Sequence, residues 1–380
     1  MAVAGVKILV LNAGSSSLKF DLFEAETEQR LCGGVIERVE NMSEALGAVF
    51  AQIGAVEISA VGHRVVHGGD LFRESVVIDS RVESGIEALC SIAPLHNPHN
   101  LEAYRAARTR LPGVPHVAVF DTAFHQTLPA RAFTYGLPWE YLAEKKIRRY
   151  GFHGISHRSV SLQFAELAGG KPKDFRMITC HLGNGCSVCA IDQGWSVDTS
   201  MGFTPMEGLI MGTRSGDVDA GAILHLIIEE AIEPRDLLRT LNSECGLKGI
   251  SGVSNDMRDV LAAEAGNERA ALAVEVFCYR VRKYIGAYLA AMNGADALIF
   301  TGGIGENSPV IRARICAQMD QLGVRVDAAR NEAVSSDARQ IGDSKVAVWV
   351  VPANEELLIA RDTLRCTRTP FPVKLLENLP

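Results

Sequence analysis

Residues 8–22 read ILVLNAGSSSLKFDL, and a later part of the chain repeats their plan. The first four residues are apolar and predict a buried strand, whereas the polar run NAGSSS at 12–17 predicts a turn into a second strand. Gly14 can adopt a positive φ, and the hydroxyls and backbone N–H groups of such a turn can surround an anion, with Lys19 close behind. The chain has no Walker or dinucleotide glycine motif. The stretch therefore predicts a phosphate turn of another type or, alternatively, a plain serine-rich hairpin tip.

The plan of strand, small polar turn and strand recurs at residues 177–191, MITCHLGNGCSVCAI. Two distant copies indicate duplicated domains rather than a repeat array. Two such turns facing one cleft would bind a polyphosphate.

The length and charge of the chain limit its class. With 380 residues we expect two domains with separate cores. A net charge of −7 argues against nucleic-acid and membrane-surface partners, which need clustered Lys and Arg, so we expect small-molecule partners. Lys7 interrupts the first apolar run, no run is long enough for a membrane helix, and nine cysteines suit reduced thiols. We therefore expect a cytoplasmic protein.

Two groups of residues also permit a metal-site interpretation. Cys180 and His181 lie near the C-x-x-C pair Cys186 and Cys189, but strand alternation would splay these ligands, which favours ordinary strand cysteines. Histidines 153 and 157 could share a metal on a helix, whereas Gly151 and Gly154 favour a loop before a helix from residue 156.

Charged residues stand at the ends of several predicted strands. Arg64 and His67 lie where the strand 60–69 meets a glycine corner, and a buried Arg there requires a structural carboxylate or a substrate anion. Asp121 ends the strand 114–121, and Glu355 follows the strand 346–351. Because ligands bind at the carboxyl ends of strands in α/β sheets, both carboxylates are candidates for metal or base chemistry, although a simple turn aspartate remains the alternative.

The remaining elements follow from periodicity and caps. Asn100 is predicted to cap a helix that runs to Arg110. The long Gly/Thr/Ser-rich segment 197–219, with Arg214 near its end, is predicted to be a functional loop. We expect a strand from 296 followed by a glycine turn at 302–305. Further helices are predicted at 43–53, 84–91, 220–232, 235–242, 268–292 and after 355.

Nine motifs in this order resemble the acetate kinase family, within the superfamily of acetate and sugar kinases and actin, over essentially the whole chain. They are NAGSSSLKF from Asn12, GHRVVHGG from Gly62, APLHNPHN from Ala93, VFDTAFH from Val119, YGFHGISH from Tyr150, HLGNG from His181, VDTSMGFTPMEGLIMGTRSGD from Val197, FTGGIGEN from Phe300 and NEEL from Asn354. The chain departs from the family pattern in a shorter segment between residues 23 and 60, in Cys186 where a Ser is usual, and in Ile155 where a Thr is common.

The resemblance implies an α/β fold of two duplicated ribonuclease-H-like domains, the actin-like ATPase fold, with a cleft between them. The expected N-terminal acyl and metal domain is 1–149 plus 355–380, and the expected nucleotide-binding and dimerisation domain is 150–354. It also implies a homodimer whose surface includes part of the helix 268–292.

The implied reaction is reversible transfer of the ATP γ-phosphoryl group to acetate, with Mg²⁺, or Mn²⁺, as the metal. Propionate or butyrate kinase is the alternative within the family. A chaperone-like ATPase of the superfamily is the second alternative, but the kinase motifs span 12 to 355 and leave no residues for a peptide-binding domain.

The resemblance also implies roles for individual residues. Arg64 and Arg214 would clamp the carboxylate and the transferred group, His153 would donate to the phosphoryl oxygens, and Asp121 would be the catalytic acidic residue. Asn12 and Glu355 would hold the metal. The acetate methyl group would contact Val66, Leu95, Phe152 and Pro205. The nucleotide would be bound by Lys19, His181, Leu182, Gly183, Asn184, Gly185, Asp256, Met257, Arg258, Gly303, Ile304, Gly305, Glu306 and Asn307.

Overall fold

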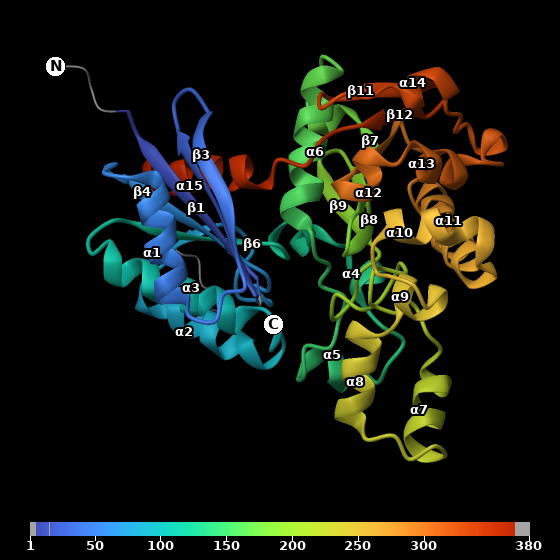
Figure 1. The fold of residues 1–380 in the computed structure, drawn as a ribbon, viewed down its shortest axis with the longest axis horizontal. Helices are drawn as coiled ribbons and strands as arrows, with labels where there is room; N and C mark the ends of the chain where they lie inside the picture. Colours follow the sequence, from blue (N-terminus) through green and yellow to red (C-terminus); the bar gives the residue numbers. More distant parts are fainter. Residues whose placement is uncertain (1–4, 15, 369–380) are drawn as a thin grey trace. The chain divides into compact units, whose positions relative to one another are not determined.

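The computed structural model describes residues 5–14 and 16–368, and the chain divides into two compact units (Figure 1). Unit 1 comprises Met1–Gln126 and Asn354–Pro380, and unit 2 comprises Thr127–Ala353. The first division falls earlier than the expected boundary at residue 149, because residues after 126 bond within unit 2. The Thr127 hydroxyl donates to the Ser196 carbonyl at 2.8 Å, for example. No helix among the described residues is both long and apolar enough to cross a membrane.

Unit 1 is built on a six-stranded mixed sheet of order β3-β2-β1-β4-β6-β5. Strands β1, β4 and β6 are parallel, while β2, β3 and β5 pair antiparallel to their neighbours. The strands are β1 Lys7–Ala13, β2 Ser17–Glu24, β3 Gln29–Glu37, β4 Ala60–Val65, β5 Val76–Val77 and β6 His116–Phe120. The α-helices are α1 Met42–Ile53, α2 Ser80–Ala88, α3 Asn97–Arg110 and α15 Glu355–Arg368.

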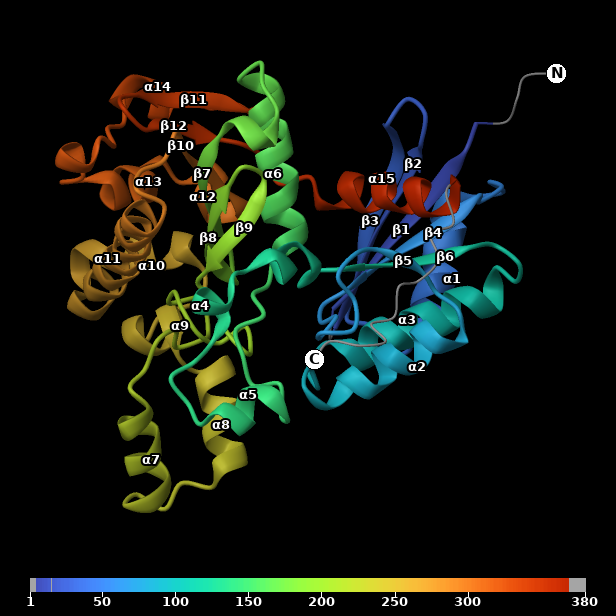
Figure 2. The ribbon, with the colours of Figure 1, turned by 180° about the vertical axis from the view of Figure 1, so that it is seen from behind.

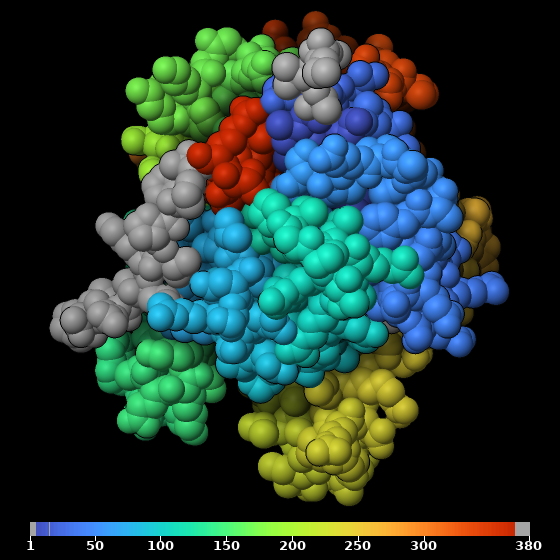
Figure 3. Space-filling view, turned by 90° about the vertical axis from the view of Figure 1, so that its left-hand side faces the viewer, coloured from blue at the N-terminus to red at the C-terminus, as the bar shows by residue number. Residues whose placement is uncertain are grey.

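Alternating side chains of this sheet face different helices. Leu9, Leu11 and Val61 are buried in one core with residues of α1 and α3. Gly62, the next residue on β4, faces α15, where an added Cβ would lie 2.3 Å from the Thr363 hydroxyl. Glycine at this position therefore allows the close approach of α15 to the sheet. Figure 3 shows unit 1 from the side, with α2 and α3 (light blue to teal) over much of the visible surface and part of α15 (red) exposed.

Unit 2 repeats the topology of unit 1 in a sheet of order β11-β12-β10-β7-β8-β9. Here β7, β10 and β12 are parallel, β8 and β9 pair antiparallel beside β7, and β11 pairs antiparallel with β12. Strand for strand, β7, β10 and β12 correspond to β1, β4 and β6, which confirms the predicted duplication. The strands are β7 Arg176–Leu182, β8 Cys186–Asp192, β9 Trp195–Thr199, β10 Ala297–Thr301, β11 Arg339–Asp343 and β12 Ala347–Val350.

Helices cover both faces of the second sheet (Figures 1 and 2). Helix α6, Gly154–Leu167, lies on one face, and α11, Glu268–Ala291, lies on the opposite face. Smaller helices extend from this framework. They are α4 Ala130–Phe133, α5 Trp139–Ala143, α7 Ala220–Ile228, α8 Pro234–Ser243, α9 Gly246–Ser251, α10 Met257–Ala263, α12 Gly302–Asn307, α13 Pro309–Cys316 and α14 Ala328–Glu332.

Three local predictions need correction. Helix α3 begins at Asn97 rather than after Asn100, so Asn100 lies inside the helix and does not cap it. Helix α6 begins at Gly154, before the expected residue 156. The predicted glycine turn after β10 is the first turn of α12, in which Gly302 has φ 77° and lies so close to the Leu182 carbonyl (2.8 Å from an added Cβ) that only glycine fits.

Candidate active site

The carboxyl ends of three parallel strands in unit 1 carry a polar cluster. Asn12 lies on β1, Arg64 on β4, and Asp121 directly after β6. The Arg64 guanidinium donates to both carboxylate oxygens of Asp121, from Nε at 3.2 Å and from Nη2, and its Nη1 donates to Asn12 Oδ1 at 3.1 Å. Burial lowers the pKa of Arg64, but Asp121 and Glu355 outweigh it and raise that pKa above its usual value. The structural carboxylate that the sequence allowed for Arg64 is therefore Asp121.

Glu355 joins this cluster from the first turn of α15 rather than from a strand end. The preceding strand β12 belongs to the second sheet, so the predicted strand-end position is wrong even though the residue follows β12 in sequence. Burial raises the pKa of Glu355 to about 7, and Asp121 and Glu356 act in the same direction, while Arg64 and Lys19 oppose them.

The oxygen donors of this cluster suit a hard cation. Asn12 offers an amide oxygen and Glu355 a carboxylate, which are ligands that Mg²⁺ accepts while keeping several waters. Within the described part of the chain, no group of three or more His, Cys, Asp or Glu side chains could hold a metal. Both ring nitrogens of His157 lie 2.7 Å from hydroxyl oxygens, of Thr179 and Ser187, so this histidine does not form the metal pair considered with His153.

Two buried asparagines hold the backbone beside Arg64. The Asn100 side chain accepts from the Val66 N–H at 3.1 Å and donates to the Ala13 carbonyl at 2.8 Å. The Asn97 side chain accepts from the His67 N–H and donates to the His67 carbonyl, both at 3.0 Å. These bonds tie the ends of β1 and β4 together, which fixes the backbone from which Arg64 extends.

In unit 2, the turn between β7 and β8 is formed by Gly183, Asn184 and Gly185. The Gly183 N–H donates to the Gly185 carbonyl at 3.0 Å, and the Asn184 carbonyl accepts from the Gly212 N–H at 3.0 Å. A Cβ added to Gly185 would lie 3.1 Å from His153 Nε2 and 3.7 Å from Arg214 Nη1. Because Gly185 has no side chain, the His153 ring and the Arg214 guanidinium can both lie close to the turn.

His153 has an unusual backbone for its position. It caps α6 in the left-handed conformation, with φ 55°, which is uncommon for a residue other than glycine. Its ring stacks on that of His181 at a centroid distance of 4.3 Å, and its Nδ1 lies 2.9 Å from Ser187 Oγ. The Nδ1 of His181 in turn lies 2.7 Å from Ser156 Oγ. Such backbone outliers persist where the surroundings hold them, and they are frequent at functional sites.

Arg214 differs from Arg64 in its electrostatic surroundings. Its Nη1 contacts the Pro205 carbonyl at 3.5 Å and Met211 Sδ at 3.8 Å, and among the described residues it forms no ion pair with a carboxylate. Burial lowers the pKa of Arg214. The nearby Cys186 thiol donates to the Gly183 carbonyl at 3.1 Å, and burial raises its pKa to about 12, so it is a neutral part of the turn. A partly buried, unpaired guanidinium is a site for an anion.

A pocket of about 710 Å³ in unit 2 lies beside the turn. It brings together three segments that are far apart in sequence, including the ion pair of Asp256 and Arg258 at 2.6 Å. Gly303 has no neighbour within 4 Å of an added Cβ, so the backbone of α12 is accessible there. The lining residues are Gly183, Asn184, Asn255, Asp256, Met257, Arg258, Leu261, Gly303, Ile304, Asn307, Ser308 and Pro309.

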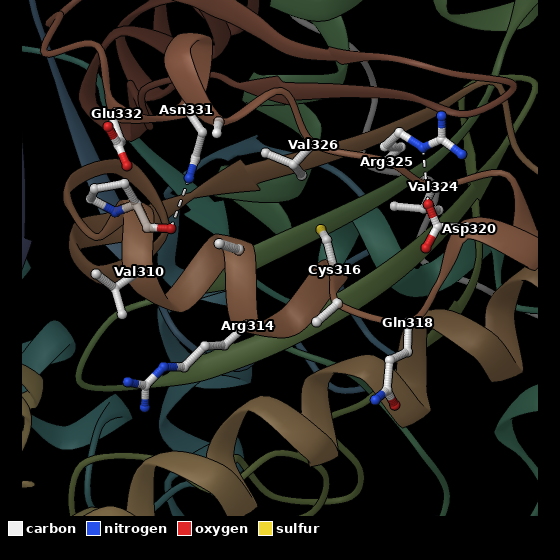
Figure 4. Close-up of a pocket in the computed structure, with 14 residues that line it drawn as sticks. Val310, Arg314, Cys316, Gln318, Asp320, Val324, Arg325, Val326, Asn331 and Glu332 are labelled. Atoms are coloured by element: carbon white, nitrogen blue, oxygen red, sulfur yellow. Dashed lines mark hydrogen bonds and ion pairs between the residues drawn. The ribbon is translucent and has the colours of Figure 1, made fainter.

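A second hollow of about 500 Å³ lies along α13, with Val310, Arg314, Cys316 and Val326 among its labelled lining residues (Figure 4). Its two arginines are already neutralised, Arg314 by Glu264 at 2.5 Å and Arg325 by Asp320 at 2.9 Å. This hollow contains none of the predicted site residues and is not part of the candidate active site.

Known proteins match the chain over almost its whole length. A model of the acetokinase family matches residues 7–54 and 41–361. The chain belongs to the acetokinase family. It is 48% identical to the acetate kinase of Thermotoga maritima, covering 94% of this chain and 98% of that protein, and 46% identical to the acetate kinase of Dictyoglomus turgidum, covering 95% and 97%.

Solved structures of two kinds within this acetokinase fold are similar to the chain. The Porphyromonas gingivalis acetate kinase has a TM-score of 0.90 and 41% identity, covering 96% of this chain and all of that chain. A propionate kinase from Francisella tularensis has a TM-score of 0.89 and 39% identity, covering 95% and 99%.

The structure distributes the predicted acetokinase residues between the two units. Of the residues predicted to contact the acyl group, Val66 and Leu95 belong to unit 1, where Val66 is buried and Leu95 is 54% exposed. Phe152, which is buried, and Pro205, which is partly buried, belong to unit 2. Lys19 forms an ion pair with Glu356 at 2.7 Å in unit 1.

Three predicted nucleotide residues have structural contacts instead of lining the pocket. The Glu306 carboxylate accepts from the backbone N–H groups of residues 302 and 353, at 2.9 and 3.0 Å. The Gly305 carbonyl accepts from Arg312 at 2.8 Å, and Leu182 is fully buried in β7.

Sequence reasoning missed the polar residues that support this site. Asn100 was expected to cap a helix, His157 was considered only as a metal ligand, and Thr179 and Ser187 were given no role. The two asparagines of APLHNPHN, one of which lies between two prolines, were the one available signal. The hydroxyls on β7 and β8 carry none, because Ser and Thr are ordinary in strands.

Proposed function

We propose that this protein catalyses reversible transfer of the γ-phosphoryl group of ATP to acetate, giving acetyl phosphate and ADP. The observation that carries the proposal is Arg214, a partly buried guanidinium without a carboxylate partner among the described residues, beside the turn at Gly185. Phosphoryl transfer places charge on three equatorial oxygens, and a positioned arginine is the side chain suited to that charge.

The groups of unit 2 would bind the nucleotide. The 183–185 turn and the accessible backbone at Gly303 can approach the phosphates closely, and the pocket beside them is large enough for a nucleoside. His153 Nε2 would donate to an equatorial oxygen, and His181 would help to position the phosphates.

The groups of unit 1 would act on the acceptor and the metal. Acetate is already a nucleophile as its carboxylate, so Asp121 need not remove a proton from it. Asp121 instead holds Arg64 through two hydrogen bonds, which orients the guanidinium for a carboxylate or phosphoryl oxygen. Asn12 and Glu355 would hold Mg²⁺, directly or through water, and the bound ion would neutralise charge on the phosphate oxygens.

The test is an acyl-hydroxamate assay with ATP, Mg²⁺ and separate reactions with acetate, propionate and butyrate. We expect acetate to give the highest kcat/KM. Arg214→Ala should lower kcat by about 10³-fold or more, the range of an arginine that meets transition-state charge. Arg239→Ala is the matched control, since Arg239 is 73% exposed and pairs with Asp236. Folded protein that forms no hydroxamate with any of the three acids would refute the proposal.

Propionate kinase is the second candidate, because the Francisella tularensis propionate kinase matches the fold almost as well as the Porphyromonas gingivalis acetate kinase does, with TM-scores of 0.89 and 0.90. The same panel separates the two. A higher kcat/KM for propionate than for acetate in the wild-type protein would replace the first assignment with the second.

We also propose that the protein is a cytoplasmic homodimer. Its nine cysteines all lie in the described part of the chain and form no disulfide there, which suits a reducing compartment. Leu224 and Ile228 on α7 are 55% and 68% exposed, and Leu272 and Tyr279 on α11 are 50% and 58% exposed. Such apolar exposure suits a subunit interface. Light scattering should give twice the mass of the chain, and a monomer at micromolar concentration would contradict the dimer.

A further inference from the structure

A buried chain of hydroxyls and imidazoles extends from His153 into unit 2. His153 Nδ1 lies 2.9 Å from Ser187 Oγ, and the same oxygen lies 2.7 Å from His157 Nε2. His157 Nδ1 lies 2.7 Å from Thr179 Oγ1. Ser187, His157 and Thr179 are each fully buried. Hydroxyls from β7 and β8 thus alternate with rings from α6 and the residue that caps it.

The Ser187 hydroxyl has only one proton, so it can donate to only one of the two ring nitrogens. The other ring nitrogen then donates to the Ser187 oxygen. If Ser187 donates to His153, then His157 donates to Ser187, and Thr179 donates to His157 Nδ1. If every bond is reversed, His157 donates to Thr179, and the Thr179 hydroxyl proton needs another acceptor.

Thr179 decides between the two orders. Its side chain has no hydrogen-bond partner other than His157 within residues 5–14 and 16–368. The reversed order would therefore leave a buried hydroxyl donor without an acceptor, which is costly. The first order uses every proton and leaves the His153 hydrogen on Nε2. That nitrogen is the one near Gly185, where an added Cβ would lie 3.1 Å away.

We propose that Thr179, His157 and Ser187 are positioning residues that fix His153 as the neutral tautomer protonated at Nε2. Phosphoryl oxygens only accept hydrogen bonds, so His153 can contact them through this nitrogen only when the proton is there. The inference rests on the proposed function for the reaction that this donor serves, but the tautomer itself can be measured without turnover.

The experiment compares Thr179→Val with Thr179→Ser in the full-length protein. Valine removes the first hydroxyl of the chain, three hydrogen bonds from His153, whereas serine keeps it. ¹⁵N NMR of histidine-labelled protein, assigned with His153→Gln, should show His153 protonated at Nε2 in the wild type and in Thr179→Ser. In Thr179→Val we expect both tautomers. The kcat should fall by about tenfold or more, but by less than the roughly 10²–10³-fold fall that follows removal of a whole donor. The KM for ATP and for acetate should change by less than about threefold.

Ser187→Ala is a second variant, should Thr179→Val not fold, and we expect the same tautomer mixture with a larger loss in kcat. Ser196→Ala is the control, because it removes an equally buried hydroxyl that bonds Cys189 instead of this chain. Wild-type His153 protonated at Nδ1 or at both nitrogens would overturn the proposal, as would an unchanged tautomer in both variants. Full activity in His153→Gln would instead refute the proposed role of His153 in the reaction.

Discussion

The pair of Arg64 and Asp121 can be tested for separate contributions to folding and to turnover. We consider Arg64→Met, Asp121→Asn and the double variant. The two side chains form a bidentate ion pair in which the Asp121 side chain is 1% exposed and that of Arg64 is 20% exposed. If the pair were only structural, the double variant, in which both charges are removed, would regain both stability and activity.

The burial of Asp121 sets the expected size of each effect. Arg64→Met leaves a buried carboxylate without its partner, and we expect the free energy of unfolding to fall by about 3–5 kcal/mol. Asp121→Asn leaves the more exposed guanidinium beside Glu355 and should cost less. In the double variant both charges are gone, and replacing a buried pair by neutral side chains is often close to neutral, so most of the stability should return. Turnover should remain at least about 10³-fold down in both Arg64 variants.

Urea unfolding followed by circular dichroism, together with the hydroxamate assay, measures both quantities on the same preparations. Arg361→Met is the control in the same unit, since its pair with Glu28 is exposed on both sides and should contribute less than about 1 kcal/mol. Recovery of more than a tenth of wild-type turnover in the double variant would show that the pair serves the fold alone.

Three further results are expected. Glu355→Ala should raise the Mg²⁺ concentration for half-maximal rate, and an unaltered titration would remove Glu355 from the metal site. In the wild type that concentration should rise as the pH falls below about 7, because protons then compete for the carboxylate. Val66→Ala should raise the ratio of kcat/KM for propionate over acetate by about tenfold, as expected for one methylene, and an unmoved ratio would remove Val66 from the acyl pocket. Burial lowers the pKa of His63 well below its usual value and that of His116 to about 4, so stability is retained above the unfolded value of about 6.5 and should fall as the pH drops towards 4. His116→Asn should lose less urea resistance between pH 7.5 and 5 than the wild type, and an equal loss would show that other groups control acid unfolding.

Residues at strand ends were predictable from the sequence, because an apolar run followed by a polar residue is a local pattern. This applies to Asp121, which directly follows β6 as expected, whereas Asn12 was expected in the turn but lies on β1, which extends to Ala13. The same strand-end pattern also singled out Glu355, but the pattern does not apply there, since the strand before it belongs to the other sheet. The sequence order of β12 and Glu355 does not reveal that the chain changes units between them.

Supporting residues were not predictable, because their partners are distant in sequence. Asn100 precedes a helical run and therefore resembles an N-cap, yet its amide bonds residues that lie 34 and 87 positions away. Thr179 and Ser187 resemble ordinary strand residues, and only the pairing of β7 with β8 and the packing of α6 bring them to His157. Local patterns identify the groups that stand at an edge, whereas the groups that orient them depend on tertiary contacts.

The two copies of one topology carry different groups at equivalent strand ends. The ends of β1, β4 and β6 bear an amide, a guanidinium and a carboxylate, and the guanidinium donates hydrogen bonds to the other two groups. The equivalent ends of β7 and β10 lead into Gly183 and Gly302, where the backbone itself is exposed or closely packed. Under the proposed function, the charged side chains of unit 1 would bind a small anion and a metal, and the glycine backbone of unit 2 would allow the close approach that phosphate groups of a nucleotide require. Gly303→Asp should therefore weaken nucleotide binding, because it would place a carboxylate beside backbone that is accessible to phosphate groups.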